Sequence, residues 1–375
     1  MAIQLFAATF EVEECLAEIR ECLEKGWTGL GFKTVQFEDT WKAYTGMPHA
    51  HYLNSATVGL ELAVKVLKME NNWADGDEII STPLTFVSSN HAILYAGMDV
   101  VFADVDEYLC LDPKSIEERI TPKTRAVMFV GLGGNVGRYE EVAALCKKRG
   151  LKLILDAAHM AGTRLHGEIP GKDADAAVYS FQAVKNLPTA DSGMICFKEA
   201  KYDEIVRKLT WLGINKDTYA RTNEAGSYKW MYDVEYLGYK YHGNSVMAAI
   251  GLVQLKYLDR DNAYRRTLAD WYEGHFKGTA VRTIPVAPDC ESSRHLFQIC
   301  IQNRDELMAA LNTHEIYPGV HYRDNTEYRM YAHGKGTCPN SHKASDELIS
   351  LPMHMRLTRT DVDYIAECVL KYVKG

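Results

Sequence analysis

The sequence lacks the patterns of a metal site, a disulfide framework or a membrane protein. Its nine cysteines include no CxxC pair, and its thirteen histidines show no HExxH spacing. An odd number of scattered cysteines is typical of reduced thiols, so we expect no metal and no disulfides. No apolar run reaches the roughly 18 residues that a transmembrane helix needs.

The chain also lacks an excess of basic charge. A formal net charge of −8 argues against binding to nucleic acid or to an anionic membrane. The first residues, MAIQLFAATFEVEE, have no basic region before their short apolar stretch, so we expect mature sequence and a cytoplasmic protein. A hydrophobic content of 47% in 375 residues is ordinary for a globular chain with a large core.

Short apolar runs alternate with amphipathic segments along most of the chain, which predicts right-handed βαβ units and a mainly parallel sheet. The C-terminal part predicts a different mixture of helices and short strands. We expect two helices over 246–258 and 263–278, and strands over 295–301 and 320–322.

Chemically informative residues concentrate between residues 151 and 197. An apolar run ends at Asp156, a second run carries Ser180, and Lys185 follows in the next connection. The carboxyl ends of parallel strands are where α/β sheets bind their ligands. We therefore expect these three side chains to face one site.

The three residues suit pyridoxal phosphate, which needs a lysine for a Schiff base and an acid beside its ring nitrogen. Hydroxyl groups such as that of Ser180 would bind the phosphate. Taken singly, an acid at a strand end, like Asp156, is more often a helix cap or turn residue, and a lone lysine, like Lys185, is usually a solvated surface charge. Their combination in one α/β unit favours the cofactor.

Two further segments predict contacts to the same cofactor. Ser55, Ala56 and Thr57 stand at a strand-to-helix junction, where free backbone N–H groups bind phosphate. An ordinary helix N-cap is the alternative. The Phe86 ring could stack on the pyridine ring, although an aromatic residue in such a turn is as often part of the core.

The patterns D-A-A-H (156–159) and S-F-Q-A-V-K-N (180–186) resemble the DegT/DnrJ/StrS family of pyridoxal-phosphate-dependent nucleotide-sugar aminotransferases. The resemblance covers nearly the whole chain. It implies that Asp156 pairs with the ring nitrogen, that His159 lies by the phenolic oxygen, that Ser180 binds phosphate and that Lys185 forms the Schiff base.

The resemblance also implies the type I fold of aspartate aminotransferase, an α/β fold. We expect a large domain over residues 1–260, with a mainly parallel seven-stranded sheet between helices, and a small α+β domain over 261–375. The relatives are homodimers in which one subunit touches the cofactor phosphate of its partner. Lys240, His242 and Asn244 stand at the corresponding positions, and which of them makes the contact stays open.

The implied reaction moves an amino group from an amino acid, here L-glutamate, to a nucleotide-linked keto-deoxyhexose, through pyridoxamine phosphate. It would serve amino-sugar biosynthesis. The expected substrate-binding residues are Trp27, Thr28, Gly29, Lys216, Arg221, His321 and Tyr322. Two alternatives are a pyridoxal-phosphate-dependent sugar dehydratase, which typically lacks the lysine, and a binding protein of the same fold without turnover.

Overall fold

The computed structural model describes residues 2–215 and 231–374 and is built around a seven-stranded sheet. The strand order is β1-β8-β7-β5-β4-β2-β3; five neighbouring strands run parallel, and β8 is antiparallel to both β7 and β1. The prediction of a mainly parallel sheet is confirmed. The strands are β1 (His49–Leu53), β2 (Glu78–Ser81), β3 (Asp99–Phe102), β4 (Thr124–Val130), β5 (Lys152–Asp156), β7 (Ala176–Ser180) and β8 (Gly193–Phe197).

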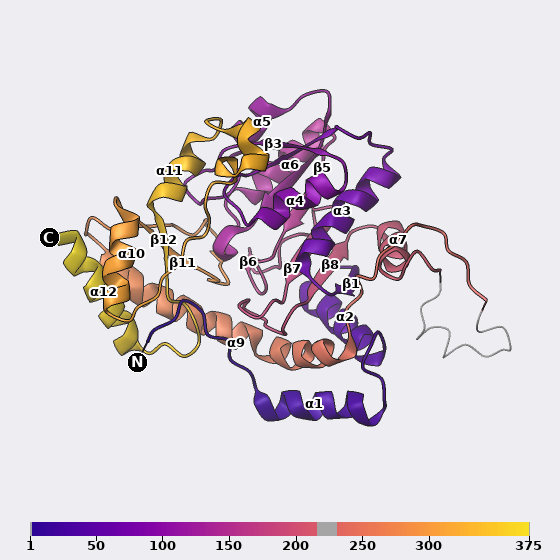
Figure 1. Ribbon diagram of the computed structural model, residues 1–375, viewed down its shortest axis with the longest axis horizontal. Helices are drawn as coiled ribbons and strands as arrows, with labels where there is room; N and C mark the ends of the chain where they lie inside the picture. Colours follow the sequence, from indigo (N-terminus) through magenta and orange to yellow (C-terminus); the bar gives the residue numbers. More distant parts are fainter. Residues whose placement is uncertain (1, 216–230, 375) are drawn as a thin grey trace.

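Helices cover both faces of this sheet, because successive strand side chains point to opposite sides (Figure 1). In β4, Val127 and Phe129 join one core, while Ala126 and Met128 join the other. The first face packs against α2 (Phe32–Thr45), α5 (Pro113–Arg119), α6 (Tyr139–Arg149) and part of α9 (Ser245–Phe276). The second packs against α3 (Ala56–Glu70), α4 (Val87–Tyr95) and α7 (Ala200–Thr210).

The C-terminal part has a separate apolar core and a three-stranded antiparallel sheet. In Figure 1 it lies at the end of the molecule opposite α7, and α9 runs between the two parts, with α1 alongside it. Its elements are β9 (Arg282–Thr283), β11 (Phe297–Cys300), α10 (Arg304–Thr313), α11 (Pro339–Glu347), β12 (Leu348–Leu351) and α12 (Arg359–Lys374). The remaining helix and strand pair are α1 (Val12–Glu24), β6 (Arg164–Leu165) and β10 (Cys290–Glu291).

The prediction of two helices over 246–258 and 263–278 is wrong, since α9 is continuous for 32 residues. The polar stretch between them resembles a break, but tertiary contacts satisfy its polar groups. Tyr44 and Arg164 hydrogen-bond to Asp259, and Asn262 is buried with both ends of its amide hydrogen-bonded. The expected domain boundary after residue 260 falls inside this helix, and the division into 1–260 and 261–375 stays a prediction.

The predicted strand over 320–322 does not form, although the preceding Gly319 makes an isolated antiparallel bridge to Ser350. Gln298 Nε2 donates to the His321 carbonyl at 2.6 Å, and His321 Nδ1 lies 3.0 Å from Ser350 Oγ. The strand that pairs with β11 is β12 instead, in the register Phe297 to Leu351.

All nine cysteines are free thiols, and eight of them are buried. In the part of the chain that the structure describes, no three His, Cys, Asp or Glu side chains are grouped closely enough to hold a metal ion. None of the helices over 2–215 and 231–374 combines the length and apolarity of a membrane span.

Gly193 in β8 is required by the close approach of the α3 N-terminus. A Cβ atom at this position would lie 2.6 Å from Ala56 N and 2.8 Å from Ser55 C, both backbone atoms that cannot move aside. We expect Gly193→Ala to lower the free energy of unfolding by about 1–3 kcal/mol in urea denaturation. Gly274→Ala, in α9 with nothing near the added methyl group, is the control. Equal stability of the two variants would contradict the prediction.

Candidate active site

A cavity of about 440 Å³ opens at the carboxyl ends of the central strands, within the usual size of a small-molecule site. Val130, Asp156 and Ser180, the last residues of β4, β5 and β7, form its floor. Its other walls come from the α3 N-terminus, the turn before α4, the loop after β7 and the segment after α10. The lining residues include Ser55, Ala56, Thr57, Phe86, Asp156, His159, Ser180, Lys185, His321 and Tyr322.

Lys185 reaches this cavity from the connection between β7 and β8. Its backbone N–H donates to the Gln182 carbonyl at 2.8 Å, which forms a tight turn five residues after Ser180. Burial disfavours the ammonium form and lowers the pKa of Lys185 to about 8, while the charge of nearby Asp156 opposes that shift. About a tenth of this lysine is therefore an uncharged, nucleophilic amine at pH 7, far more than for a lysine with the usual pKa of about 10.4.

Asp156 is buried at the end of β5 and has hydrogen-bond donors but no cation bound to it. Ser89 Oγ donates to Oδ2 at 2.6 Å, and the Ala158 N–H donates to Oδ1 at 3.1 Å. Among the described residues none forms an ion pair with Asp156. Burial raises the pKa of Asp156, and the positive charge of Lys185 counteracts this only in part. A protonated ring nitrogen is the partner that this carboxylate lacks, so Asp156 fits the expected cofactor.

His159 is held as a neutral ring of one tautomer. The Gly133 N–H donates to Nδ1 at 3.1 Å, so the ring proton is on Nε2, which lies 3.2 Å from Tyr322 Oη. Burial and the charge of Lys185 hold the pKa of His159 well below its usual range. The ring therefore offers a hydrogen-bond donor to the cavity without carrying charge.

The α3 N-terminus forms the end of the cavity that suits a phosphate. Ser55 is the N-cap, and its hydroxyl accepts a 3.4 Å hydrogen bond from Val58 N. Ala56 and Thr57 follow in the first turn, where backbone N–H groups and the helix dipole favour an anion. Ser180 lines the same cavity, and its strand partner Gly193 packs against Ser55 and Ala56. The α3 N-terminus and the nearby hydroxyl groups together provide the hydrogen-bond donors that the expected phosphate needs.

Aromatic residues form the opposite wall. The Phe86 ring is 56% exposed although it lines the cavity, and its centroid lies 5.8 Å from that of Tyr322. An apolar ring left open in this position is available for stacking on a planar group. His321, beside Tyr322, has its pKa lowered to about 4 by burial and by Lys185, so this wall is uncharged at neutral pH.

Other predicted site residues lie outside the cavity. The carbonyls of Thr28 and Gly29 accept from the Ser245 N–H, and Trp27 Nε1 donates to the Leu30 carbonyl. Asn244 is the N-cap of α9, with its Oδ1 accepting from Met247 N at 2.9 Å. These roles hold the α9 N-terminus in place. Lys216 and Arg221 fall outside the described residues.

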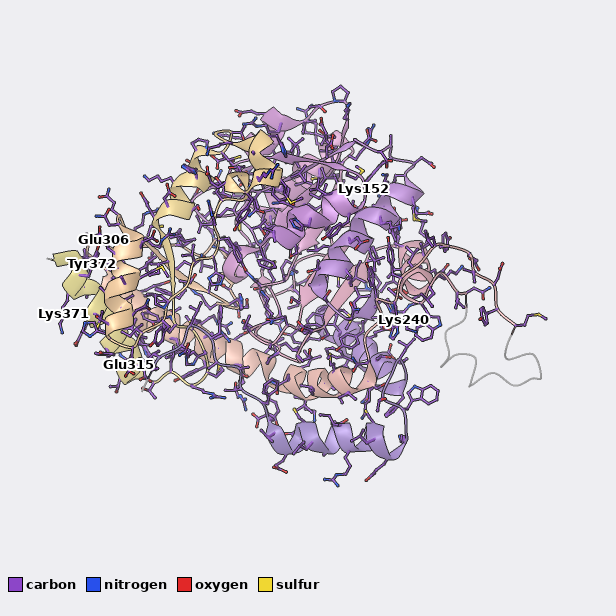
Figure 2. The ribbon with its side chains drawn as sticks, viewed as in Figure 1. Lys152, Lys240, Glu306, Glu315, Lys371 and Tyr372 are labelled. Carbon is purple, nitrogen blue, oxygen red and sulfur yellow. The ribbon has the colours of Figure 1, made fainter. Side chains whose placement is uncertain are left out.

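Lys240 and His242 also lie away from the cavity of their own chain, in the segment that packs on Trp211. Figure 2 shows Lys240 on the α7 side of the molecule. Its ammonium group lies 3.2 Å from the centre of the Trp211 ring, and the His242 ring lies 4.6 Å from that ring.

The structure adds residues that the sequence analysis missed. Ser89 binds Asp156, and Gln182, Asp191 and Ser192 line the cavity. The serine pair at the start of α4, directly after Phe86, is a signal that could have indicated Ser89. No local pattern indicates the contact to Asp156, because 67 residues separate the two side chains.

The lowered pKa of Lys185 can be measured without any ligand. We expect Lys185 to react with an amine-specific reagent with a pH midpoint near 8, since only the unprotonated amine reacts. Asp156→Asn should lower this midpoint further, because it removes a negative charge that stabilises the ammonium form. Mass spectrometry of the labelled peptide gives both values, with a small lysine derivative as the reference. A midpoint near that of the free amine, about 10, would contradict the prediction.

Comparison with known proteins agrees with this geometry. The sequence profile of the DegT/DnrJ/EryC1/StrS aminotransferase family matches residues 10–370. The chain is 33% identical to the spore coat polysaccharide biosynthesis protein SpsC of Bacillus subtilis, over 97% of this chain and 95% of SpsC.

Solved structures of sugar aminotransferases have the same fold. Spr1654 of Streptococcus pneumoniae, described as a sugar aminotransferase, superposes in its PLP form with a TM-score of 0.90 at 27% identity, over 100% of this chain and 99% of Spr1654. Its pyridoxamine phosphate (PMP) form gives the same TM-score and identity, over 100% of this chain and 98% of Spr1654. Helicobacter pylori PseC, an aminotransferase of pseudoaminic acid biosynthesis, gives 0.90 at 26% identity over 100% of both chains. The protein therefore belongs to the DegT/DnrJ/EryC1/StrS family and is a pyridoxal-phosphate-dependent aminotransferase of the type I fold.

Proposed function

We propose that this enzyme transfers an amino group from L-glutamate to a nucleotide-linked keto-deoxyhexose in amino-sugar biosynthesis. The observation that carries the proposal is the placement of Lys185 and Asp156 in one cavity, with an amine of pKa about 8 beside a carboxylate that lacks a cation. Pyridoxal phosphate bound there supplies an electron sink for the substrate carbon.

Lys185 is assigned two tasks. Its Nζ would hold the cofactor covalently, and once freed by the amino donor the same nitrogen would carry a proton. As the neutral amine it would accept the proton from the α-carbon of the donor, and as the ammonium it would return that proton to the cofactor side. A pKa of about 8 brings the amine close enough to neutrality to accept this proton and, as the ammonium, to give it up.

Asp156 and His159 orient the ring and set its charge. The Asp156 carboxylate, fixed by Ser89 and the Ala158 N–H, would keep the ring nitrogen protonated. The His159 Nε2–H would donate to the phenolic oxygen, with Tyr322 as its present neighbour. Because His159 stays neutral, it adds no positive charge that would compete with the ring nitrogen for Asp156.

The charge around the phosphate end supports a homodimer. Of the Lys and Arg side chains in the described ranges, Lys185 alone lines the cavity, and Asp191 adds negative charge there. The dianionic phosphate would thus rely on hydroxyls and the helix dipole within one chain. We assign the missing positive charge to a second copy, whose Lys240–Asn244 segment includes Lys240, His242 and Asn244.

The names of the relatives support a sugar acceptor. SpsC is a protein of spore coat polysaccharide biosynthesis, and PseC acts in pseudoaminic acid biosynthesis. His321 and Tyr322 are assigned to the sugar side of the cavity, with Phe86 stacked on the cofactor. Trp27, Thr28, Gly29, Lys216 and Arg221 remain our predictions for the nucleotide and sugar. The presence of Lys185 argues against a dehydratase.

The first half-reaction can be tested by absorption spectroscopy. The protein with pyridoxal phosphate should show a visible band that moves to shorter wavelength when L-glutamate is added, because the aldehyde form becomes the amine form. Lys185→Ala should lose the original band and all turnover, while the exposed Lys172→Ala should behave as the native protein. Circular dichroism checks that both variants fold. A band whose wavelength does not change when glutamate is added would contradict the assignment of glutamate as the amino donor.

The shared site can be tested by mixing two inactive variants. Lys185→Ala lacks the reacting amine, and the double variant Lys240→Ala/His242→Ala lacks the charge assigned to the partner. Mixed dimers would contain one intact site of two, so refolding an equal mixture should restore roughly a quarter of native activity. Lys185→Ala mixed with Lys172→Ala/Lys185→Ala is the matched control and should stay inactive. No recovery in the first mixture would contradict a site shared between subunits.

A further inference from the structure

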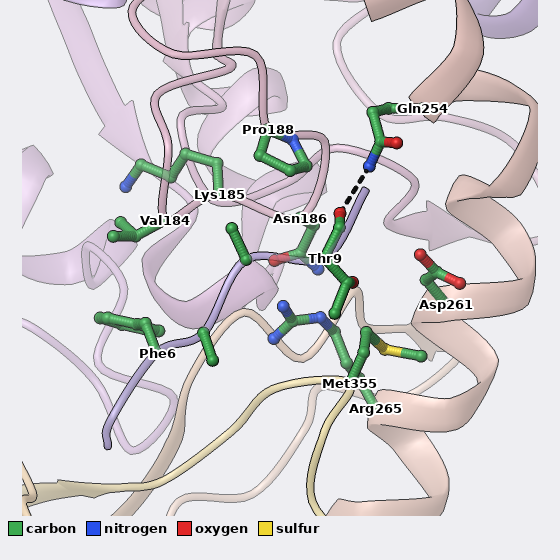
Figure 3. A pocket seen from close by; sticks show the side chains of 12 residues that line it. Phe6, Thr9, Val184, Lys185, Asn186, Pro188, Gln254, Asp261, Arg265 and Met355 are labelled. Atoms are coloured by element: carbon green, nitrogen blue, oxygen red, sulfur yellow. Dashed lines mark hydrogen bonds between the residues drawn. The ribbon is translucent and has the colours of Figure 1, made fainter. Parts of the chain in front are cut away.

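A hydrogen-bonded network of buried side chains lies directly behind Lys185, and the proposed reaction does not use it. Asn186 Nδ2 donates to Asn262 Oδ1 and to the Ser293 carbonyl, both at 2.7 Å. Its Oδ1 lies 2.9 Å from His295 Nδ1. Figure 3 shows Lys185 and Asn186 leaving the loop in different directions, so Asn186 faces the rear of the site. The four network residues are buried.

The donor and acceptor roles in this network are fixed by backbone carbonyls. Because the Ser293 carbonyl can only accept, Asn186 Nδ2 must face it, and Asn186 Oδ1 must accept from His295 Nδ1–H. Asn262 Nδ2 donates to the Ala161 carbonyl at 2.9 Å, which turns its Oδ1 toward Asn186. Burial holds the pKa of His295 well below its usual range, so the network is neutral. Each of these amide groups has one arrangement that satisfies it.

The same segment also holds His159. Ser293 Oγ donates to the His159 carbonyl at 2.7 Å, and the His295 N–H donates to the Gly133 carbonyl at 3.0 Å. Gly133 in turn donates to His159 Nδ1, and the two histidine rings lie 4.3 Å apart. A Cβ atom at Gly134 would lie 2.2 Å from Ser293 Oγ, so the glycine permits this close packing.

We propose that Asn186 and His295 are positioning residues that fix the Lys185 loop and the His159 ring relative to each other. The inference rests on the proposed roles of Lys185 and His159. Apolar packing would stabilise the same region without setting a direction, whereas a fully satisfied polar network admits one geometry. Ser293 is the point at which the two halves of the network meet.

Displacement of Lys185 should be visible in its proton affinity. The charged and polar groups that face it are Asp156, His159, His295 and His321, and each interaction depends on distance. Loss of the network therefore changes two measurable properties at once, the titration of the Lys185 amine and the rate of proton transfer by that amine.

The test compares His295→Asn with His295→Leu. The amide nitrogen of asparagine can replace Nδ1–H as the donor to Asn186, whereas leucine leaves Asn186 Oδ1 without a donor. We expect His295→Leu to shift the pH midpoint of Lys185 labelling, in protein without cofactor, by roughly half a unit or more. With pyridoxal phosphate, it should slow the glutamate half-reaction on the order of ten- to a hundredfold with little change in glutamate affinity. His295→Asn should recover most of both losses.

Different results identify different failures. If His295→Leu keeps the native midpoint and rate, or if His295→Asn is impaired as much as His295→Leu, the positioning role is wrong. His354→Leu, which removes a buried histidine elsewhere, controls for loss of stability and should leave both readouts native. Should His295→Leu not fold, Ser293→Ala removes only the hydroxyl bound to the His159 carbonyl and must change the rate for the inference to survive. A native protein that forms no visible band with pyridoxal phosphate would instead overturn the proposed function.

Discussion

The burial of the Asp156 carboxylate is the constraint on which the rest of the site depends. Taking a carboxylate out of water without a cation bound to it costs several kcal/mol, and two hydrogen bonds from Ser89 and Ala158 offset only part of that cost. Asp156 ends β5, where the three preceding residues are also buried, so the fold keeps its carboxylate away from water. The fold thus holds ready a negative charge that a cationic ring would neutralise, which makes the apo protein complementary to its cofactor.

Burial shifts the pKa values of Lys185 and Asp156 one way, and the charge of each residue shifts the pKa of the other the opposite way. Burial alone would drive both groups toward their neutral forms, while their mutual attraction favours both charged forms. The result is a lysine with a pKa near neutrality beside an acid that stays available to a ring nitrogen. His159, His321 and His295 are kept neutral by the same burial, so the buried charges of the cavity are those of Lys185 and Asp156, with the exposed Asp191 as a further negative charge in its lining. Separate environments for neighbouring titratable groups are how one site obtains distinct acid and base roles.

The sequence predicted the parts of this arrangement that are local. Asp156, His159, Ser180 and Lys185 follow consecutive strand ends, and parallel strands place such ends at one edge of a sheet, so one cavity collects them. Contacts between distant segments were not predictable. The sequence shows that Asn262 is polar, which suggests a break between two helices. It does not show that the partners of Asn262 are Asn186 and Ala161, which lie 76 and 101 residues away. The contacts of the 320–322 segment were not predictable for the same reason. Gln298 of β11 binds the His321 carbonyl, and Ser350 of β12 binds the His321 side chain.

The long-range contacts also explain how the two parts of the molecule share one site. Lys185 and His159 lie in loops that follow strands of the large sheet, whereas Ser293 and His295 precede β11 of the small one. Phe6 of the N-terminal segment stacks on His295 with ring centroids 5.4 Å apart. Apolar packing between two such bodies tolerates small sliding movements, because its energy varies little with direction. Hydrogen bonds such as these, 2.7–3.1 Å long, prefer angles above about 150° and weaken steeply below about 120°, so they fix the orientation of the two parts at their interface. Proton transfer by Lys185 needs that accuracy, and a network outside the reacting cavity supplies it without adding charge to the cavity.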